Sequence, residues 1–405
     1  MKADEAALPV PVPHRADPVL FSVVLVLVGL GLVMVYSSSA VLAQQKMGDS
    51  RYFLVRDLVW VLLGLVGMAV TMRIDYSLYR RLAYPILGLS TTLLTAVLVV
   101  GVRVNGARRW FHVGPLSFQP AELAKVALII FLAHILAKKA DLVRRFLIGF
   151  LPPLLVCGLF SGLLLKQPDL GTAMIVGGIT ITMLFVAGTR FSFLAIAGLG
   201  ALPIVYNAIV GTPWRLRRIL AFLDPWQFRD TFGYQMAASL IAVGSGGLSG
   251  QGLGDSRQKL LFLPEAHTDY ILAIIGEELG FIGIGSVIAL YALLILRGCL
   301  TAARSRDAFG LYLAVGITAM FGLQAAFNIG VVLGALPTKG LTLPLLSFGG
   351  STLVIDLCAI GILLNISRRE PAPVEKPQKG RSWKSWLPGR KNRRRSTQRL
   401  AGARA

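Results

Sequence analysis

The sequence predicts an all-α membrane protein, a bundle of about ten transmembrane helices with one long loop outside the membrane. Two observations support this class: 55% of the 405 residues are hydrophobic, and the mean hydropathy is +0.68. A soluble domain does not need so much apolar sequence. The apolar stretches have the length of a spanning helix rather than of a barrel strand, which favours a helical bundle.

Ten apolar stretches follow one another along the chain, and each is predicted to cross the membrane once. They lie at 18–38, 54–72, 82–102, 120–137, 146–164, 170–187, 191–210, 270–295, 308–334 and 342–365. The first stretch is too long for a signal peptide and lacks a small-residue cleavage site, so it is expected to remain as the first span. No clear internal repeat is visible, which counts against a transporter built from inverted repeats.

The two ends of the chain differ in composition from the spans. Residues 1–17 are rich in proline and polar residues, which predicts a disordered cytoplasmic leader. Residues 368–405 are rich in Pro, Lys, Arg and Ser, which predicts a disordered basic tail. Because a basic run beside a span is typical of contact with anionic lipid, we expect no nucleic acid partner. Residues 18–367 then form one membrane domain.

The distribution of charge predicts the orientation in the bacterial cytoplasmic membrane. An even number of spans puts both termini on one side. The amino terminus and the short loops on that side carry more Lys and Arg than the loops opposite, for example at Arg80, Arg81, Arg144 and Arg145. The positive-inside rule therefore predicts cytoplasmic termini. The long loop, 211–269, is then outside.

Two segments of the long loop have a recognisable pattern. Residues 214–223 predict a short amphipathic helix in the membrane interface, whose basic face could meet either lipid headgroups or substrate phosphates. Residues 244–254 contain six glycines, which predicts a loop shaped to cover a cavity. This segment lacks the strand-then-helix context and the GK[ST] ending of a nucleotide loop, so no ATP site is expected.

The end of the long loop gathers ionisable residues where the chain enters an apolar span. Glu265, His267 and Asp269 come directly before the eighth span, and Glu277 and Glu278 follow about two helical turns later. Ionisable groups at that depth are costly, which makes them candidates for function. Asp269 could cap the helix or act as a general base. We expect Glu277 and Glu278 to support the site.

A second group of charges lies near the outer ends of the third and fourth spans. Arg108 and Arg109 suit anionic oxygens, either of a substrate or of lipid headgroups. Glu122 and Lys125 lie three residues apart on one face of the fourth span. They are predicted to pair with each other, in a structural rather than a catalytic role.

Further charges occupy two outside turns. Lys166 and Asp169 lie between the fifth and sixth spans, and Lys339 precedes the tenth, where Pro and Gly break the helix. Asp356, inside that span, is expected to hydrogen-bond to a neighbouring helix. The outer cations and carboxylates could together hold a diphosphate and deprotonate a hydroxyl. Spacing alone leaves an enzyme and a transporter both open.

Six segments carry a resemblance to a known family. They lie at 105–110, 119–125, 167–173, 221–225, 264–269 and 343–351. At these motifs the sequence resembles the SEDS family (shape, elongation, division and sporulation proteins), over about residues 18–367, and it is most similar to the division members. Phe348 and Thr352 are mild departures from the family pattern.

The resemblance implies a peptidoglycan glycosyltransferase that polymerises lipid II during septal wall synthesis, with Asp269 as the essential acid and likewise the candidate base. It implies a substrate site in which cations neutralise the departing diphosphate. The residues that we expect to bind substrate are Arg108, Arg109, Lys166, Lys339, Glu265 and His267, with Asp169 among the supporting residues.

The resemblance also implies partners and leaves alternatives open. Division members work with a class B penicillin-binding protein and with divisome regulatory proteins. No cofactor is firmly implied, although a divalent cation, Mg²⁺ or Mn²⁺, would suit a departing diphosphate. The alternatives are a lipid II flippase, an elongation-type polymerase and a non-enzymatic scaffold of the division complex.

Overall fold

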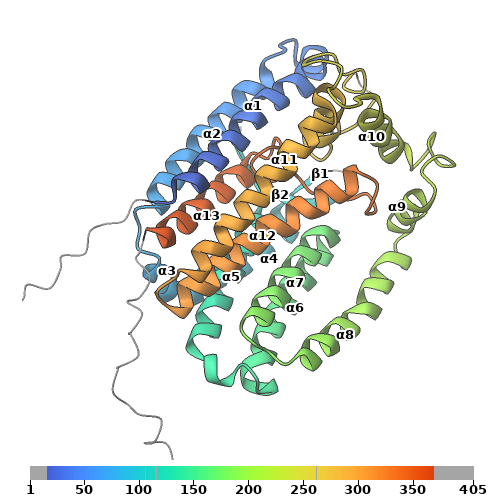
Figure 1. The fold of residues 1–405 in the computed structure, drawn as a ribbon. Helices are drawn as coiled ribbons and strands as arrows, with labels where there is room; N and C mark the ends of the chain where they lie inside the picture. Colours follow the sequence, from blue (N-terminus) through green and yellow to red (C-terminus); the bar gives the residue numbers. More distant parts are fainter. Residues whose placement is uncertain (1–15, 105, 115, 261, 369–405) are drawn as a thin grey trace, which may run out of the picture. The chain divides into compact units, whose positions relative to one another are not determined.

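The computed structural model describes residues 16–104, 106–114, 116–260 and 262–368. This part of the chain is mostly helical, with one small sheet (Figure 1). Residues 1–15 of the predicted leader, the tail from 369 onward and Asn105 lie outside the described residues.

Each predicted span corresponds to a helix, which confirms the all-α class. Eight helices, counting α6 with the π-helical turn Phe146–Phe150, are long and apolar enough to cross a membrane; α7 and α13 are shorter. The ten helices are α1 (Pro18–Met47), α2 (Tyr52–Thr71), α4 (Ala83–Val100), α5 (Pro120–Lys138), α6 (Leu151–Lys166), α7 (Leu170–Val186), α8 (Phe191–Val210), α11 (Ile271–Ala303), α12 (Ala308–Val332) and α13 (Ser351–Ser367). The short elements are α3 (Ser77–Arg81), α9 (Pro213–Leu223), α10 (Tyr234–Ser245) and the 3₁₀ turn Ala140–Leu142.

The tenth span starts later than the sequence predicted. Residues 342–350 are not helical, and α13 begins only at Ser351. Pro344 has no N–H for a helix, and the next residue, Leu345, has a positive φ of 65°. The hydroxyl of Tyr291 donates to the Pro344 carbonyl, so part of this buried backbone is satisfied by a neighbouring helix.

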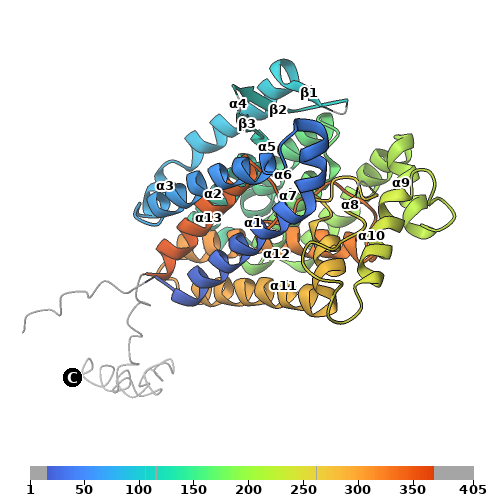
Figure 2. The ribbon, with the colours of Figure 1, turned by 90° about the horizontal axis from the view of Figure 1, so that it is seen from above.

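A three-stranded antiparallel sheet lies between α4 and α5, and the sequence analysis missed it. Its strands are β1 (Val102–Val104), β2 (Ala107–Val113) and β3 (Leu116–Phe118), in the order β1-β2-β3 (Figure 2). Asn-Gly at 105–106 is a strong hairpin signal that could have revealed it. It was overlooked because the residues between the third and fourth predicted spans were assigned to an outside loop.

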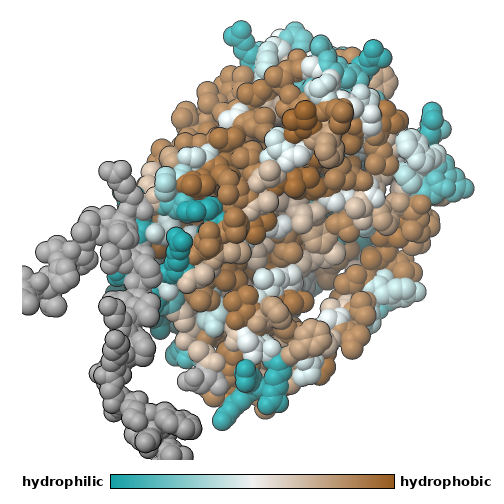
Figure 3. All heavy atoms as spheres, viewed as in Figure 1, coloured by the Kyte–Doolittle hydropathy of each residue, from teal (hydrophilic) through white to brown (hydrophobic). Residues whose placement is uncertain are grey.

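The helices pack around α5, whose buried residues run along nearly its whole length. α5 contacts α4, α7, α12 and α13, while α13 packs along α2 and α11 along α12 and α1. α8 lies at the edge of the bundle, and Leu194 is its one buried residue. One face of the molecule is broadly hydrophobic, with hydrophilic residues gathered toward its margins, as expected of a surface in lipid (Figure 3).

The described ends of α1 and α13 meet at the same end of the bundle. The Asp17 backbone N–H donates to Ser367 Oγ at 3.1 Å, and Asp17 also pairs with Arg297 at 2.5 Å. This agrees with an even number of crossings. Cytoplasmic placement of that end stays a prediction.

The glycine-rich segment 244–254 packs on α11, and its last residues, Leu253 and Gly254, line a second pocket beside α1 rather than the main cavity. Gly280 has a φ of 67°, which breaks the helical backbone. The freed groups are used by the segment: Phe281 N–H donates to the Gly247 carbonyl at 2.9 Å. A Cβ on Gly246 would collide with the Gly276 carbonyl oxygen, so only glycine allows this approach.

Candidate active site

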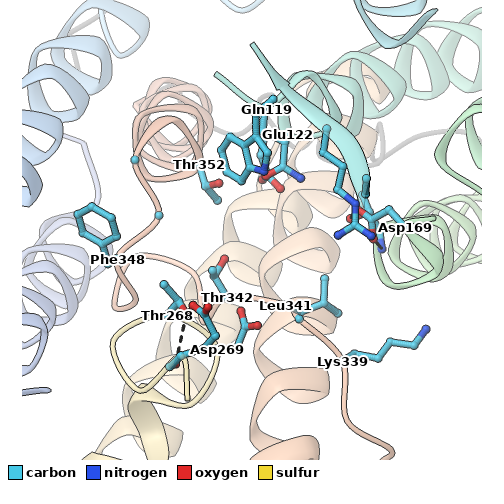
Figure 4. A pocket seen from close by; sticks show the side chains of 18 of the residues that line it. Gln119, Glu122, Asp169, Thr268, Asp269, Lys339, Leu341, Thr342, Phe348 and Thr352 are labelled. Carbon is cyan, nitrogen blue, oxygen red and sulfur yellow. Dashed lines mark hydrogen bonds between the residues drawn. The ribbon is translucent and has the colours of Figure 1, made fainter. Parts of the chain in front are cut away.

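A cavity of about 950 Å³ lies at the end of the bundle away from Asp17 and Ser367. Its lining comes from β2, the first turns of α5, α7 and α13, part of α9, the turn 264–270 and the segment 339–350. Figure 4 shows side chains from several of these elements, among them Asp269, Glu122 and Asp169, arranged around one space. The cavity thus gathers segments that are far apart in the sequence.

Asp269 lies in a tight turn at the edge of this cavity. The N–H groups of Thr268 and Tyr270 both donate to the Glu265 carbonyl at 3.2 Å, and Glu265 has a positive φ of 57°. The Thr268 hydroxyl donates to the Glu265 carboxylate at 2.8 Å. Helix α11 begins after Tyr270 and has no side-chain cap, so the structure does not use Asp269 as a cap.

The surroundings of Asp269 suit a proton acceptor that works near neutral pH. Burial, reinforced by the charge of Glu265, raises the pKa of Asp269 to about 7, against the opposing effect of Arg218 and Arg109. A general base is most effective when its pKa lies near the working pH. The carboxyl rests against Gly340, where an added Cβ would lie 2.9 Å from Oδ2.

Several cations line the same cavity, among them Arg109, Arg218 and Lys339. The Arg109 guanidinium donates to the carbonyls of Gln167 at 2.9 Å and Pro168 at 2.8 Å, which fixes it to the turn before α7. Burial lowers the pKa of Lys339 to about 8, with Asp169 opposing this effect and Arg215 and Arg218 adding to it. An acid and several cations therefore share one partly dry space.

Comparison with known proteins assigns a family to this arrangement. A family model described as "Cell cycle protein", of FtsW, RodA and SpoVE, matches residues 18–371. The chain belongs to this family. A protein of Trichlorobacter lovleyi named "Probable peptidoglycan glycosyltransferase FtsW" is 49% identical over 353 residues, 87% of this chain and 93% of the relative. "Stage V sporulation protein E" of Bacillus subtilis is 42% identical, covering 87% of this chain and 97% of the relative.

Solved structures of related proteins share the fold. A chain from "Structural coordination of polymerization and crosslinking by a peptidoglycan synthase complex" aligns with a TM-score of 0.73 at 34% identity, covering 87% of this chain and 98% of that one. The rod shape determining protein RodA of Thermus thermophilus aligns with a TM-score of 0.67 at 32% identity, covering 88% and 98%. This FtsW/RodA/SpoVE family member is an integral membrane protein.

Three residues expected to bind substrate lie away from the cavity. Arg108 follows the alternation of β2 and points opposite to Arg109; its guanidinium donates to the Val99 carbonyl at the end of α4 at 2.5 Å. Lys166 is exposed at the end of α6 and does not line the cavity. His267 packs against the ring of Phe53 at 4.7 Å, and burial lowers its pKa. The structure therefore does not bring these three residues to the cavity, and their binding of substrate stays a prediction.

Arg218 is a cavity residue that the sequence analysis did not select. It lies on α9, the amphipathic helix predicted at 214–223, and it lines the cavity beside Asp269. Its guanidinium lies 3.5 Å from the Thr338 carbonyl. The amphipathic pattern gave the helix but not the direction of each arginine, because Arg215 on the same helix donates to the Ala208 carbonyl instead.

The supporting acids hold the framework of the site. Asp169 accepts hydrogen bonds from the N–H of Thr172 at 3.1 Å and from its hydroxyl at 2.8 Å, which caps α7. Glu277 accepts from the Ser256 hydroxyl at 2.5 Å, and Glu278 pairs with Lys259 at 2.9 Å. The two glutamates therefore anchor the outer loop on α11 and do not line the cavity.

Three ionisable residues lie near one another on α5 and α13, and two of them, Glu122 and Lys125, line the cavity. Lys125 and Glu122 form the ion pair that their spacing predicted, at 2.7 Å. The hydrogen bond expected for Asp356 is wrong: its two carboxylate oxygens are buried with no hydrogen-bond partner among the described residues. The charges acting on Asp356 are those of Lys125 and Glu122.

The described residues contain no group of three or more His, Cys, Asp or Glu side chains that could hold a metal ion. In the cavity, Asp169 caps α7 and Glu122 pairs with Lys125. The divalent cation stays a prediction, and no step below depends on it.

Proposed function

We propose that the chain is a peptidoglycan glycosyltransferase that polymerises lipid II into glycan strands during septal wall synthesis. Family membership and relatives named FtsW at 44–49% identity support this activity and favour division over elongation. The observation that carries the site assignment is the Asp269 carboxyl, with a pKa of about 7, in a cavity that also holds Arg109, Arg218 and Lys339.

The reaction follows from these groups. Asp269 takes the proton from the acceptor's sugar hydroxyl, and the oxygen attacks the anomeric carbon of the donor. The bond from that carbon to the diphosphate breaks, and the electron pair leaves with undecaprenyl diphosphate. Arg109, Arg218 and Lys339 stabilise the negative charge that develops there. One displacement inverts an α-linked donor to a β-1,4 bond.

The partners and the location are part of the same proposal. The cavity end of the bundle faces outward from the bacterial cytoplasmic membrane, and both termini are cytoplasmic. The protein works at the septum with a class B penicillin-binding protein and divisome regulators. A solved relative from a peptidoglycan synthase complex supports a partner of this kind.

The test is polymerisation of labelled lipid II by the purified protein with its cognate penicillin-binding protein, in liposomes that also report lipid II translocation. A polymerase yields glycan strands. Translocation of lipid II without any glycan would overturn the proposal in favour of a flippase, and neither activity from an intact complex would favour a scaffold.

The pH profile of kcat/KM is expected to be bell-shaped. Asp269, with its pKa raised to about 7, is protonated and inactive at lower pH. Lys339, with its pKa lowered to about 8, loses the charge that binds diphosphate at higher pH. We therefore expect kcat/KM to fall about tenfold per pH unit on the acid side, below about pH 6.

Two variants check which group causes each limb of this profile. Glu265→Gln removes a negative neighbour, lowers the pKa of Asp269 and moves the acid limb to lower pH. Lys339→Arg keeps its charge and removes the alkaline limb. Steady-state rates from pH 5 to 9 measure both effects. If the acid and alkaline limbs stay at the same pH in these variants, the assignment of the limbs to Asp269 and Lys339 is wrong.

The two arginines Arg218 and Arg108 are expected to behave differently although both lie outside the membrane. Arg218→Ala should raise KM for lipid II about tenfold or more, because a charge-assisted contact to phosphate is lost. Arg108→Ala should leave KM within about twofold, since this guanidinium is exposed and bonded to α4 carbonyls. Equal effects of the two substitutions would place the diphosphate elsewhere.

A further inference from the structure

Asn328 joins two backbone segments that border the cavity. It lies on α12, and its side chain is buried, with the residue 2% exposed. Its Nδ2 group donates to the carbonyls of Asp269 and Leu341, each at 2.7 Å. One carbonyl belongs to the turn before α11 and the other to the non-helical stretch after α12. A single amide thus ties the proposed base to a separate part of the chain.

The same tie fixes Asp269 relative to the segment that carries Lys339, a cation that lines the same cavity. Gly340 lies close to the carboxyl, because a Cβ added at this residue would be 2.9 Å from Asp269 Oδ2. Lys339 precedes Gly340, and Leu341, which Asn328 holds, follows it. A shift of this segment would change the separation of base and cation together.

The chemistry of the contact requires a donor. Both targets are carbonyl oxygens, so only a side chain with two N–H groups can bridge them. The amide oxygen of Asn328, in contrast, has no hydrogen-bond partner among the described residues. The Nδ2 group of Asn328 therefore makes two hydrogen bonds, while its buried amide oxygen makes none among the described residues. An unpaired buried oxygen lowers the stability of the fold, so an amide at this position is best explained by the two bonds that it donates.

We propose that Asn328 is a positioning residue, whose amide holds Asp269 and the segment 339–342 in one geometry so that base and cation face the same substrate. The proposal rests on the proposed function for its catalytic consequence. The link between the turn before α11 and the segment after α12 rests only on the two hydrogen bonds of Asn328.

The first measurement is hydrogen–deuterium exchange on the full-length protein in detergent, wild type beside Asn328→Asp. An aspartate of the same shape sets an acceptor against two carbonyls. We expect faster exchange in peptides covering 265–270 and 339–346 and no change elsewhere in α12. Thr318→Val is the matched control, because Thr318 is a buried polar residue on the same helix, with no hydrogen-bond partner for its hydroxyl among the described residues. If exchange in these peptides is unchanged in Asn328→Asp, Asn328 does not hold the two segments together.

The second measurement is steady-state polymerisation of lipid II by the same proteins. We expect Asn328→Asp to lower kcat about 10- to 100-fold with KM nearly unchanged, because misplacing a reacting group by about 1 Å has that effect. A normal kcat despite faster exchange would overturn the positioning role. If the wild type itself makes no glycan, the proposed function fails, and the exchange data still decide the tie.

Gly340→Ala keeps the test decisive if Asn328→Asp does not fold. Gly340 is exposed, and its methyl group would push on Asp269 Oδ2 while leaving the Asn328 bonds in place. A fall in kcat without a change in KM supports the proposal from the opposite side of the contact. A fully active Gly340→Ala protein would contradict it.

Discussion

Asp269→Asn is expected to reduce polymerisation of lipid II by about 10²- to 10⁴-fold, the usual contribution of a general base. The amide has nearly the same shape as the carboxyl but cannot accept the proton of the sugar hydroxyl. Burial raises the pKa of Asp269 to about 7, which suits this carboxyl to the role of base, so we expect little activity to be recovered through another group. KM should change far less than kcat, because the cations that bind diphosphate remain.

The control for this variant is Asp255→Asn, which makes the same chemical change on the same outer loop. Asp255 is exposed and does not line the main cavity, so its rate should match that of the wild type. Glycan assembly is followed with labelled lipid II, and melting curves show that both variants are folded. Full activity of Asp269→Asn would remove Asp269 as the base, and loss of activity in both variants would indicate a general effect of charge on the loop.

The sequence was sufficient for the helices and for the proposed base, for physical reasons. Apolar runs long enough to span lipid form helices wherever they occur, so the ten helices required no tertiary information. Asp269 was visible because a carboxylate at the start of an apolar span is costly and so indicates function. The Glu122–Lys125 pair was visible because residues three apart share a helix face.

The remaining site residues depend on contacts that a single sequence does not display. Choosing between Arg108 and Arg109 requires the register of β2, because neighbours on a strand point to opposite faces. Arg218 comes near Asp269 only because α9 borders the same cavity as the turn before α11. His267 stands two residues before Asp269, yet its ring is turned toward Phe53 and Phe348. Distance along the sequence therefore did not predict which of these side chains line the cavity.

The second large effect is expected on stability, from Lys125→Met. Lys125 and Glu122 are 4% and 8% exposed in their side chains. Removing the lysine leaves Glu122 buried without a counter-charge, beside Asp356, whose oxygens already lack hydrogen-bond partners among the described residues. Breaking a buried ion pair in this way typically costs about 3–5 kcal/mol.

A double variant distinguishes loss of the charge balance from loss of packing. Glu122→Gln combined with Lys125→Met removes both charges, so it should be clearly more stable than Lys125→Met alone, because no unbalanced glutamate remains. Lys46→Met is the exposed control and should shift the melting temperature little. The wild type and the three variants are ranked by the apparent melting temperatures of the full-length proteins, measured in one detergent at one heating rate. If the double variant melts no higher than the single one, the lysine stabilises the bundle through its packing, and the charge argument for this cluster is wrong.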